Sequence, residues 1–261
     1  MIRSLYTGTT GMNSQQLNID VISNNLANVS TTGFKKSINN FQDLLYETIQ
    51  NPGSPTSADT ESPAGIQIGL GVRPAAVTKV FSQGELIGTE NELDVAIEGS
   101  GFFQIELPGG DTAYTRAGAF KLDSNGTIVN SSGYTVLPSI TIPEGANRIN
   151  ISDTGVVSAV LAGENVATEL GTMELAIFTN SAGLSSVGDN LLVETNASGT
   201  PALGTPGDDG YGQLVQRFLE GSNVNIVQEL TNLITAQRAY EINSKSIQTS
   251  DEMMQTTNQL K

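Results

Sequence analysis

The sequence contains no cysteine, no histidine and no tryptophan. The absence of Cys and His excludes disulfides, thiolate chemistry, imidazole acid–base catalysis and metal sites built on these ligands. No apolar run approaches the ~18 residues of a transmembrane helix, so we expect no membrane insertion. The first residues, Met1–Gly8, lack the continuous apolar stretch of a secretory signal. If the protein leaves the cytoplasm, we expect export without a cleaved signal peptide.

Charge is also scarce. Charged residues make up 15% of the 261-residue chain, yet its net charge is −15 and it has only 12 Lys and Arg. This balance argues against binding to nucleic acid or to an anionic membrane surface, since both need clustered positive charge. The apolar content of 38% is that of a globular chain with one large or two modest domains.

Candidate catalytic or ligand-binding motifs are few. Asp123–Gly126 has the opening of a calcium loop but lacks the later bidentate Glu, and it fits a hairpin turn better. Gly207–Gly210 contains two Asp but fits a solvated loop, and Gly99–Gly101 lacks the third glycine of a dinucleotide loop. We therefore expect no enzymatic activity, no metal and no cofactor.

The C-terminal segment, residues 222–261, has a seven-residue apolar repeat. A repeat of this period keeps one stripe of a long helix facing a neighbour. Asn225 is placed to cap the helix and Gln228 to return the bond. The predicted seam consists of Ile226, Leu230, Leu233, Tyr240, Ile247 and Met254.

The N-terminal segment has a second seven-residue apolar repeat. A helix is expected from about Ser4 to Asn28, ended by the turn Thr31-Thr32-Gly33. Asp20 is the only charged residue between Ser4 and Thr32, so this surface can be buried without leaving an unpaired charge. We interpret both seams as surfaces for burial between subunits, with an intramolecular two-helix hairpin as the alternative. The predicted N-terminal seam consists of Leu5, Met12, Ile19, Ile22, Leu26 and Val29.

Between the two helices the pattern changes. Apolar residues from Phe34 to Ile49 predict a short amphipathic helix or an extended continuation, and Pro52–Gly65 predicts a long loop. Thereafter a period of two, punctuated by Gly and Asn, predicts short strands. The expected strands are 66–68, 77–81, 94–98, 102–107, 113–116, 120–122, 127–129, 134–137, 140–142, 148–151, 156–160, 173–178 and 191–194.

The predicted fold class is α+β. A discontinuous layer of coiled-coil-like helices from the two termini is expected to carry an inserted all-β domain. The expected divisions are residues 1–33 with 222–261 for the helical assembly domain, 34–72 with 208–221 for a connector and extended loop, and 73–207 for the β domain. A chain trimmed to Val72–Gly212 is expected to keep the β domain folded.

Four motifs in order along the chain resemble those of the bacterial flagellar rod and hook proteins. Ser23–Lys35 resembles the N-terminal signature of this axial family, Asp94–Phe103 and Tyr114–Phe120 resemble internal motifs, and Gln237–Lys245 resembles the C-terminal one. Ala117 stands where an acidic residue is common. The stretch Ile66–Pro74, with the length of the chain, is most similar to the distal-rod members. The motif residues are Asn24, Asn25, Leu26, Ala27, Asn28, Thr32, Gly33, Phe34, Gln237, Arg238, Ala239 and Tyr240.

The resemblance implies a structural subunit of the flagellar basal body, outside the cytoplasm. Members of the family pack their terminal helices into the inner layer of a hollow helical tube that transmits torque, with the β domain outside. The implied partners are further copies of the chain, proximal-rod proteins, the hook protein or hook-junction proteins, the P and L bushing rings and the type III export apparatus. In distal-rod proteins the segment corresponding to about Phe41–Gly71 is thought to reach between subunits.

Two alternatives stay open. Within the family, the chain could be a proximal-rod or hook relative, although Ile66–Pro74 and the lack of a further outer domain argue against the hook. From another class, it could be a glycan- or cation-binding β domain carried on oligomerisation helices.

Overall fold

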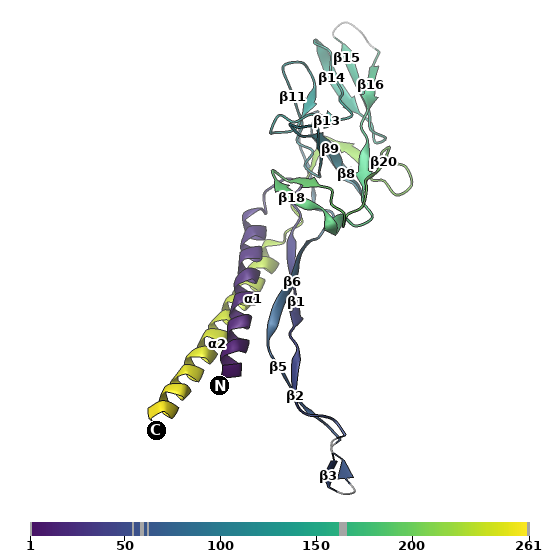
Figure 1. Ribbon diagram of the computed structural model, residues 1–261. Helices are drawn as coiled ribbons and strands as arrows, with labels where there is room; N and C mark the ends of the chain where they lie inside the picture. The colour runs from purple at the N-terminus through teal and green to yellow at the C-terminus, as the bar shows by residue number, and fades with distance from the viewer. Residues whose placement is uncertain (1, 54, 58–59, 62, 162–165, 260–261) are drawn as a thin grey trace. The chain divides into compact units, whose positions relative to one another are not determined.

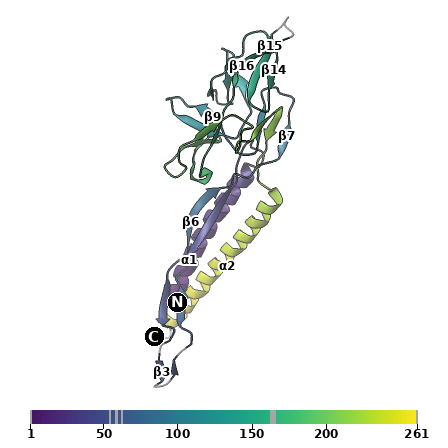
Figure 2. The ribbon, with the colours of Figure 1, turned by 90° about the vertical axis from the view of Figure 1, so that its right-hand side faces the viewer.

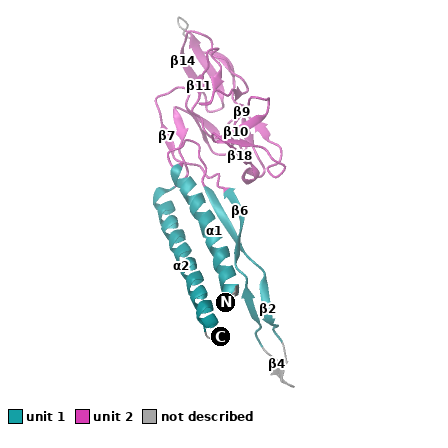
Figure 3. Cartoon of the chain, turned by 60° about the vertical axis from the view of Figure 1, so that its left-hand side comes forward, with its two compact units in different colours: residues 1–27, 37–78, 225–261 teal, residues 28–36, 79–224 magenta. Residues whose placement is uncertain are grey.

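The computed structural model describes residues 2–53, 55–57, 60–61, 63–161 and 166–259. It divides into two compact units (Figure 1 and, coloured by unit, Figure 3). Unit 1 consists of residues 1–27, 37–78 and 225–261, and unit 2 of residues 28–36 and 79–224. Two terminal helices flank a central all-β region, which confirms the predicted fold class. In the described part of the chain, none of the helices is long and apolar enough to cross a membrane.

The two helices are α1 (Ile2–Ala27) and α2 (Ile226–Gln259). The Asn225 Oδ1 accepts a hydrogen bond from the Gln228 backbone N–H at 3.1 Å, which confirms the predicted cap. The predicted return bond is wrong: among the described residues, the Asn225 N–H makes no hydrogen bond to the Gln228 side chain, whose Nε2 donates to Asn232 Oδ1 at 3.1 Å. Helix α1 ends before Gly33, whose positive φ of 69° serves the turn that follows.

The segment after α1 forms the arm, a two-stranded antiparallel ribbon in unit 1. The helical option for Phe34–Ile49 is wrong and the extended option is right. The loop predicted over Pro52–Gly65 is also partly wrong, because two short strands pair within it; residues 54, 58, 59 and 62 lie outside the described residues. The ribbon pairs β1 with β6, β2 with β5 and β3 with β4. Its strands are β1 (Ser37–Asp43), β2 (Tyr46–Gln50), β3 (Pro55–Ser57), β4 (Thr60–Glu61), β5 (Ile66–Gly69) and β6 (Val72–Lys79).

Unit 2 is built from short strands, most of them antiparallel neighbours. Its largest sheet has the order β13-β9-β10-β19-β18, and a three-stranded sheet has the order β14-β15-β16. A 3-10 turn spans Ser181–Gly183. The strands are β7 (Leu86–Gly88), β8 (Val95–Glu98), β9 (Phe103–Glu106), β10 (Thr112–Thr115), β11 (Lys121–Leu122), β12 (Ile128–Val129), β13 (Val136–Leu137), β14 (Ala146–Ile151), β15 (Val156–Leu161), β16 (Thr168–Thr172), β17 (Leu175–Ile177), β18 (Ser185–Gly188), β19 (Leu191–Val193), β20 (Ala202–Gly204), β21 (Gln213–Gln216) and β22 (Phe218–Glu220).

Most predicted strands are present, with shifted ends. The turn Asp123–Gly126 joins β11 to β12 as predicted, with Gly126 at φ 78°. Residues 140–142 form no strand, and only a single bridge joins Thr141 to Thr127. Strands β7, β16, β18, β20, β21 and β22 were not predicted. Gly, Ser or Thr interrupt the apolar alternation of the first four, whereas β21 and β22 are too short for an alternation to stand out.

The core of unit 2 comes from alternate residues of these strands. Phe103 and Phe120 meet edge to face with ring centroids 5.0 Å apart. A smaller cluster gathers around Phe102, Tyr114 and Phe178. Burial of this many large apolar side chains gives the unit a core of its own. The main cluster includes Val95, Ile97, Phe103, Ile105, Phe120, Ile128, Val157, Met173, Leu175 and Leu214.

A buried ion cluster joins the first and last segments of unit 2. Lys35 Nζ lies 2.5 Å from Glu220 Oε1, and Arg116 Nε lies 3.0 Å from Glu220 Oε2 without hydrogen-bond alignment. All three side chains are at most 5% exposed. The Arg116 guanidinium also donates to the carbonyls of Gly99 and Gly101, both at 2.8 Å. The sequence motifs Ser23–Lys35 and Tyr114–Phe120 therefore meet at one buried carboxylate.

Burial governs the protonation of this cluster. Desolvation lowers the pKa of the Lys35 ammonium, while its hydrogen bond to Glu220 and the charge of that carboxylate act in the opposite direction. Burial likewise lowers the pKa of the Arg116 guanidinium, against the attraction of Glu220. The negative charge of Glu220 offsets part of the cost of burying the two cations where water is excluded.

Unit 2 thus extends beyond Val72–Gly212 at both ends. Strand β21 pairs with β8, and β22 pairs with β7. A trimmed chain that keeps the β domain must retain the segments around Lys35 and Glu220, so we revise the expectation for Val72–Gly212.

Replacing Glu220 with Ala tests the ion cluster. Removing one partner leaves two buried cations without a counter-charge, which costs ~3–5 kcal/mol in comparable buried pairs. We expect urea unfolding followed by circular dichroism to show a loss of this size. The matched control is Arg217→Gln, which breaks an ion pair to Glu92 whose arginine side chain is 53% exposed; it should cost ~0–1 kcal/mol. Equal losses in the two variants would contradict a central role for Glu220.

Candidate assembly interface

Helices α1 and α2 pack antiparallel, side by side, with both chain ends at the same end of the pair (Figures 1 and 2). Ser4 Oγ and Ser250 Oγ lie 3.2 Å apart. A Cβ atom placed on Gly8 would lie 2.9 Å from Ile247 Cγ1, and one on Gly11 would lie 2.9 Å from Asn243 Nδ2. The two glycines therefore allow the helices to approach closely.

The face of α2 toward α1 is small and polar. Its buried residues are Glu229, Ala236 and Ser250, which fall on one seven-residue repeat. Leu233, Ile247 and Met254 of the predicted seam are half-buried, while Ile226, Leu230 and Tyr240 are exposed. The structure therefore brings only part of the predicted C-terminal seam against α1 of the same chain.

The N-terminal seam is placed similarly. Ile22 is buried, and Leu5, Met12, Ile19 and Leu26 are half-buried. Val29 is half-buried as well, but it follows the end of α1 and belongs to unit 2. The intramolecular hairpin that the sequence left as an alternative is therefore present, and burial between copies stays a prediction.

The N-terminal motif residues lie in and directly after the last turn of α1. Asn25 is 2% exposed, and its amide donates to the Ser37 carbonyl at 2.8 Å while its Oδ1 accepts from the Ser37 N–H at 2.9 Å. These two hydrogen bonds connect the last turn of α1 to the start of β1. Residues 28–36, which lie between them in the sequence, belong to unit 2. Phe34 is buried and lies under Lys79 Nζ, 5.2 Å from the ring centroid. The remaining motif residues vary in exposure: Asn24 and Ala27 are exposed, Leu26, Asn28 and Thr32 half-buried, and Gly33 buried.

The C-terminal motif is more exposed. Gln237, Arg238 and Tyr240 are exposed and Ala239 is half-buried on α2. The seven-residue repeat does not predict the other exposed apolar residues of this helix, because it describes a single stripe. A second stripe is visible in the spacing of Val227, Leu230 and Ile234.

The arm exposes a row of large apolar side chains. Leu45 is 84% exposed and Ile49 is 57% exposed. Gly71, with φ 126°, allows the arm to approach Thr10 of α1, and Arg3 forms an exposed ion pair with Glu47 at 2.5 Å. An isolated two-stranded ribbon is at best marginally stable in water. The exposed apolar residues are Ile38, Phe41, Leu45, Tyr46, Ile49, Ile66, Ile68 and Val77.

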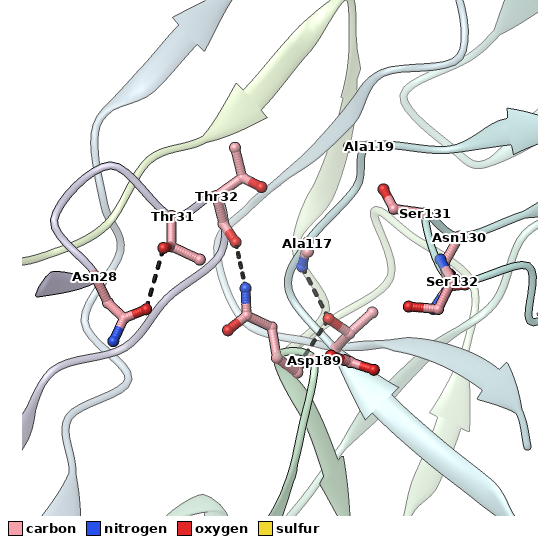
Figure 4. A pocket seen from close by; sticks show the side chains of 11 residues that line it. Asn28, Thr31, Thr32, Ala117, Ala119, Asn130, Ser131, Ser132 and Asp189 are labelled. Carbon is pink, nitrogen blue, oxygen red and sulfur yellow. Dashed lines mark hydrogen bonds between the residues drawn. The ribbon is translucent and has the colours of Figure 1, made fainter. Parts of the chain in front are cut away.

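Unit 2 contains a polar cavity of about 360 Å³ (Figure 4). The Asn190 amide donates to the Thr32 carbonyl at 3.0 Å, and Thr31 Oγ1 donates to Asn28 Oδ1 at 3.2 Å. Asp189 is the only charged residue of the lining and no aromatic ring contributes, so a sugar would find no stacking surface. The lining is Asn28, Thr31, Thr32, Thr115, Ala117, Ala119, Asn130, Ser131, Ser132, Asp189 and Asn190.

The acidic turns show no metal-binding arrangement. Asp208 Oδ2 accepts a hydrogen bond from Thr205 Oγ1 and thereby closes its own turn. Across the described ranges, no three His, Cys, Asp or Glu side chains gather as a metal site would need.

Comparison with known proteins identifies the family. Residues 5–35 match the model described as flagella basal body rod protein, residues 96–159 the flagellar hook protein FlgE/F/G D1 domain, and residues 215–260 the flagellar basal body rod FlgEFG protein C-terminal. The flagellar basal-body rod protein FlgG of Buchnera aphidicola is 51% identical over the whole of both chains. The chain belongs to the flagellar basal-body rod protein family. This confirms the resemblance drawn from the four motifs.

Relatives in distant bacteria support the same assignment. FlgG of Caulobacter vibrioides is 49% identical and FlgG of Bacillus subtilis is 44% identical, each over all of both chains. Within the family the chain therefore groups with FlgG, the distal-rod protein, as the stretch Ile66–Pro74 predicts.

Replacing Gly11 with Leu tests the close packing of the helices. The added side chain has to displace Asn243, and such overpacking typically costs ~1–3 kcal/mol. We expect a lower midpoint for thermal loss of the helical circular dichroism signal. Gln16→Leu, which adds a leucine on the exposed side of α1, is the control and should not lower the midpoint. A Gly11→Leu chain as stable as the unaltered chain would contradict the packing described.

Proposed function

We propose that copies of this chain build the distal rod of the flagellar basal body, a rigid hollow helical tube that transmits torque from the motor to the hook. The observation that carries the proposal is the contrast between the two units. Unit 2 buries a core of its own, whereas unit 1 leaves apolar side chains exposed along the arm and along α2. Large exposed apolar surfaces mark interaction sites. Because rod proteins assemble into an axial structure, we infer that the partner is a further copy of the chain.

The predicted seams have a role in this assembly. Leu230 and Tyr240 are exposed in the single chain, and Leu5, Met12 and Met254 are half-buried. Contacts between copies would bury them further and offset the cost of ordering long terminal segments. The net charge of −15 favours solubility of the single chain before assembly.

The arm is the element that stiffens the rod. It is long, thin and apolar on its surface, so it gains most of its stabilisation from neighbouring copies. Such cross-bracing would resist bending, which suits a straight drive shaft. The segment concerned, about Phe41–Gly71, contains β2 to β5 and most of the exposed apolar residues of the arm.

We propose that each predicted part of the chain has its own place in the rod. Residues 1–33 with 222–261 form the helical assembly layer, 34–72 with 208–221 the connector, and 73–207 the outer β domain. We amend this in one respect: the strands within 213–220 pair with β8 and β7 and stay with the β domain.

The cellular setting follows from the family. We propose that the protein acts outside the cytoplasm, is exported by the flagellar type III apparatus without a cleaved signal peptide, and has no enzymatic activity. Its neighbours would be proximal-rod proteins on one side, the hook or hook-junction proteins on the other, and the P and L rings around it.

Electron microscopy of the concentrated protein tests the proposal. We expect straight tubes from the full chain and none from a chain that ends at Val224, which lacks α2 but retains unit 2. Circular dichroism and two-dimensional NMR should show that the shortened chain keeps the folded β unit. Tubes formed by the shortened chain would contradict the role of the terminal helices.

A further inference from the structure

Helix α2 has an exposed face opposite the one that packs on α1. At ~100° per residue, Val227, Ile234, Arg238 and Lys245 point away from Ala236 and its buried neighbours. Val227 is 74% exposed and Ile242, near the edge of this face, 67% exposed. We call this the outer face of α2. It includes Val227, Leu230, Ile234, Arg238, Glu241, Ile242 and Lys245, all of them exposed.

Helix α1 has an exposed face of different character. It carries hydroxyls, amides and one aromatic ring, and its single charge is Asp20. We call this the outer face of α1. It consists of Tyr6, Thr9, Asn13, Gln16 and Asp20, all of them exposed.

The charges on the two faces are complementary and unused within one chain. In the part of the chain that the structure describes, neither Asp20 nor Arg238 lies within ion-pair distance of an opposite charge. The outer face of α1 carries one acid, while the outer face of α2 carries two bases, Arg238 and Lys245, with Glu241 between them. Pairing Asp20 with Arg238, the nearer base along the axis, fixes one register between the two surfaces. Complementary charges at an interface serve specificity in this way.

Within one chain, Asp20 and Arg238 lie at similar positions along the axis of the helix pair. The contacts of Ser4 with Ser250 and of Gly8 with Ile247 set the antiparallel register. Extending this register brings Asp20 level with about Ile234. Arg238 is then one helical turn away along the axis, ~6 Å. A neighbouring copy that points in the same direction needs an axial shift of only about one turn to bring its Asp20 to this Arg238.

We propose that the outer face of α1 in one copy packs on the outer face of α2 in the next, with Asp20 paired to Arg238 across the boundary. The inference rests on the proposed function, since it takes a second copy of the chain as the occupant. Repetition of the contact gives a continuous layer in which α1 and α2 alternate. The apolar residues on α2 supply the buried area, and the ion pair sets the register.

Charge reversal tests the pair in full-length protein. Asp20→Arg and Arg238→Asp each bring like charges together, so we expect each to raise the protein concentration needed for assembly by about tenfold or more. The double variant restores opposite charges and should assemble within about threefold of the unaltered chain. Sedimentation of tubes over a concentration series gives these values. Normal assembly of both single variants, or a double variant as impaired as the single ones, would overturn the proposal.

The controls are the same charge reversals on unit 2. Lys121→Asp and Asp123→Arg change exposed residues of the β11 hairpin and should leave assembly unchanged. Circular dichroism of every variant confirms that the helices remain folded. Equal effects of the control variants would show a response to net charge alone and would overturn the proposal.

Cross-linking tests the contact independently of tube formation. The chain has no cysteine, so a mixture of Asn13→Cys and Lys245→Cys chains can form a mixed disulfide only between copies. The offset that pairs Asp20 with Arg238 also places residue 13 opposite residue 245. We expect this mixed dimer to form several times faster than one from Asp123→Cys and Lys245→Cys. Equal rates would overturn the face-to-face contact. If the unaltered chain forms no tubes, the proposed function fails, while this result still decides the contact.

Discussion

The structure of unit 1 depends on one constraint, which is that thin elements bury little apolar surface. A two-stranded ribbon has two exposed faces and two open edges, and a pair of helices buries only the stripe between them. The arm and the α1–α2 pair therefore cannot cover Leu45, Ile49, Val227 or Ile242 within one chain. Their stability has to come from surfaces on other molecules. In the assembly that we propose, further copies of the chain supply these surfaces, and the incomplete packing of unit 1 leaves its apolar residues free to bind them.

Unit 2, in contrast, buries a large apolar core within one chain. Its many short strands bring Phe103, Phe120 and their neighbours into a core that needs no partner. The chain enters and leaves the unit at segments held by Glu220, which binds Lys35 and attracts Arg116. Asn223 adds to this by donating to the Val80 carbonyl at 2.8 Å and accepting from the Lys36 N–H at 2.8 Å. A domain fastened at its points of entry can keep its fold while the terminal helices change partners.

The sequence predicted the elements with strong periodicity and missed those whose pairing decides their structure. The heptads of α1 and α2 and the Asn-Gly turn at 125–126 were readable because local residue types specify them. The arm was ambiguous, since Phe34–Ile49 has helical spacing but pairs as strands with residues far along the chain. Lys35 and Arg116 lie in sequence motifs, but their association with Glu220 was not predicted, because the three residues come from separate segments. Part of the predicted C-terminal seam lies exposed in the single chain, and burial of the seams between copies stays a prediction. The opposite face of α2 was not predicted, since one repeat was taken to describe the whole helix.

Hydrogen exchange of the full chain, in dilute solution and in assembled tubes, tests most directly whether unit 1 is completed only by other copies. We predict that backbone amides of the arm, residues 37–50 and 66–79, exchange rapidly in the dilute protein and slowly in the tubes. Amides of β9 and β10 should exchange slowly in both states, since unit 2 has its own core. Equal protection of the arm in the dilute protein would contradict the account, because the ribbon would then be stable without a neighbour.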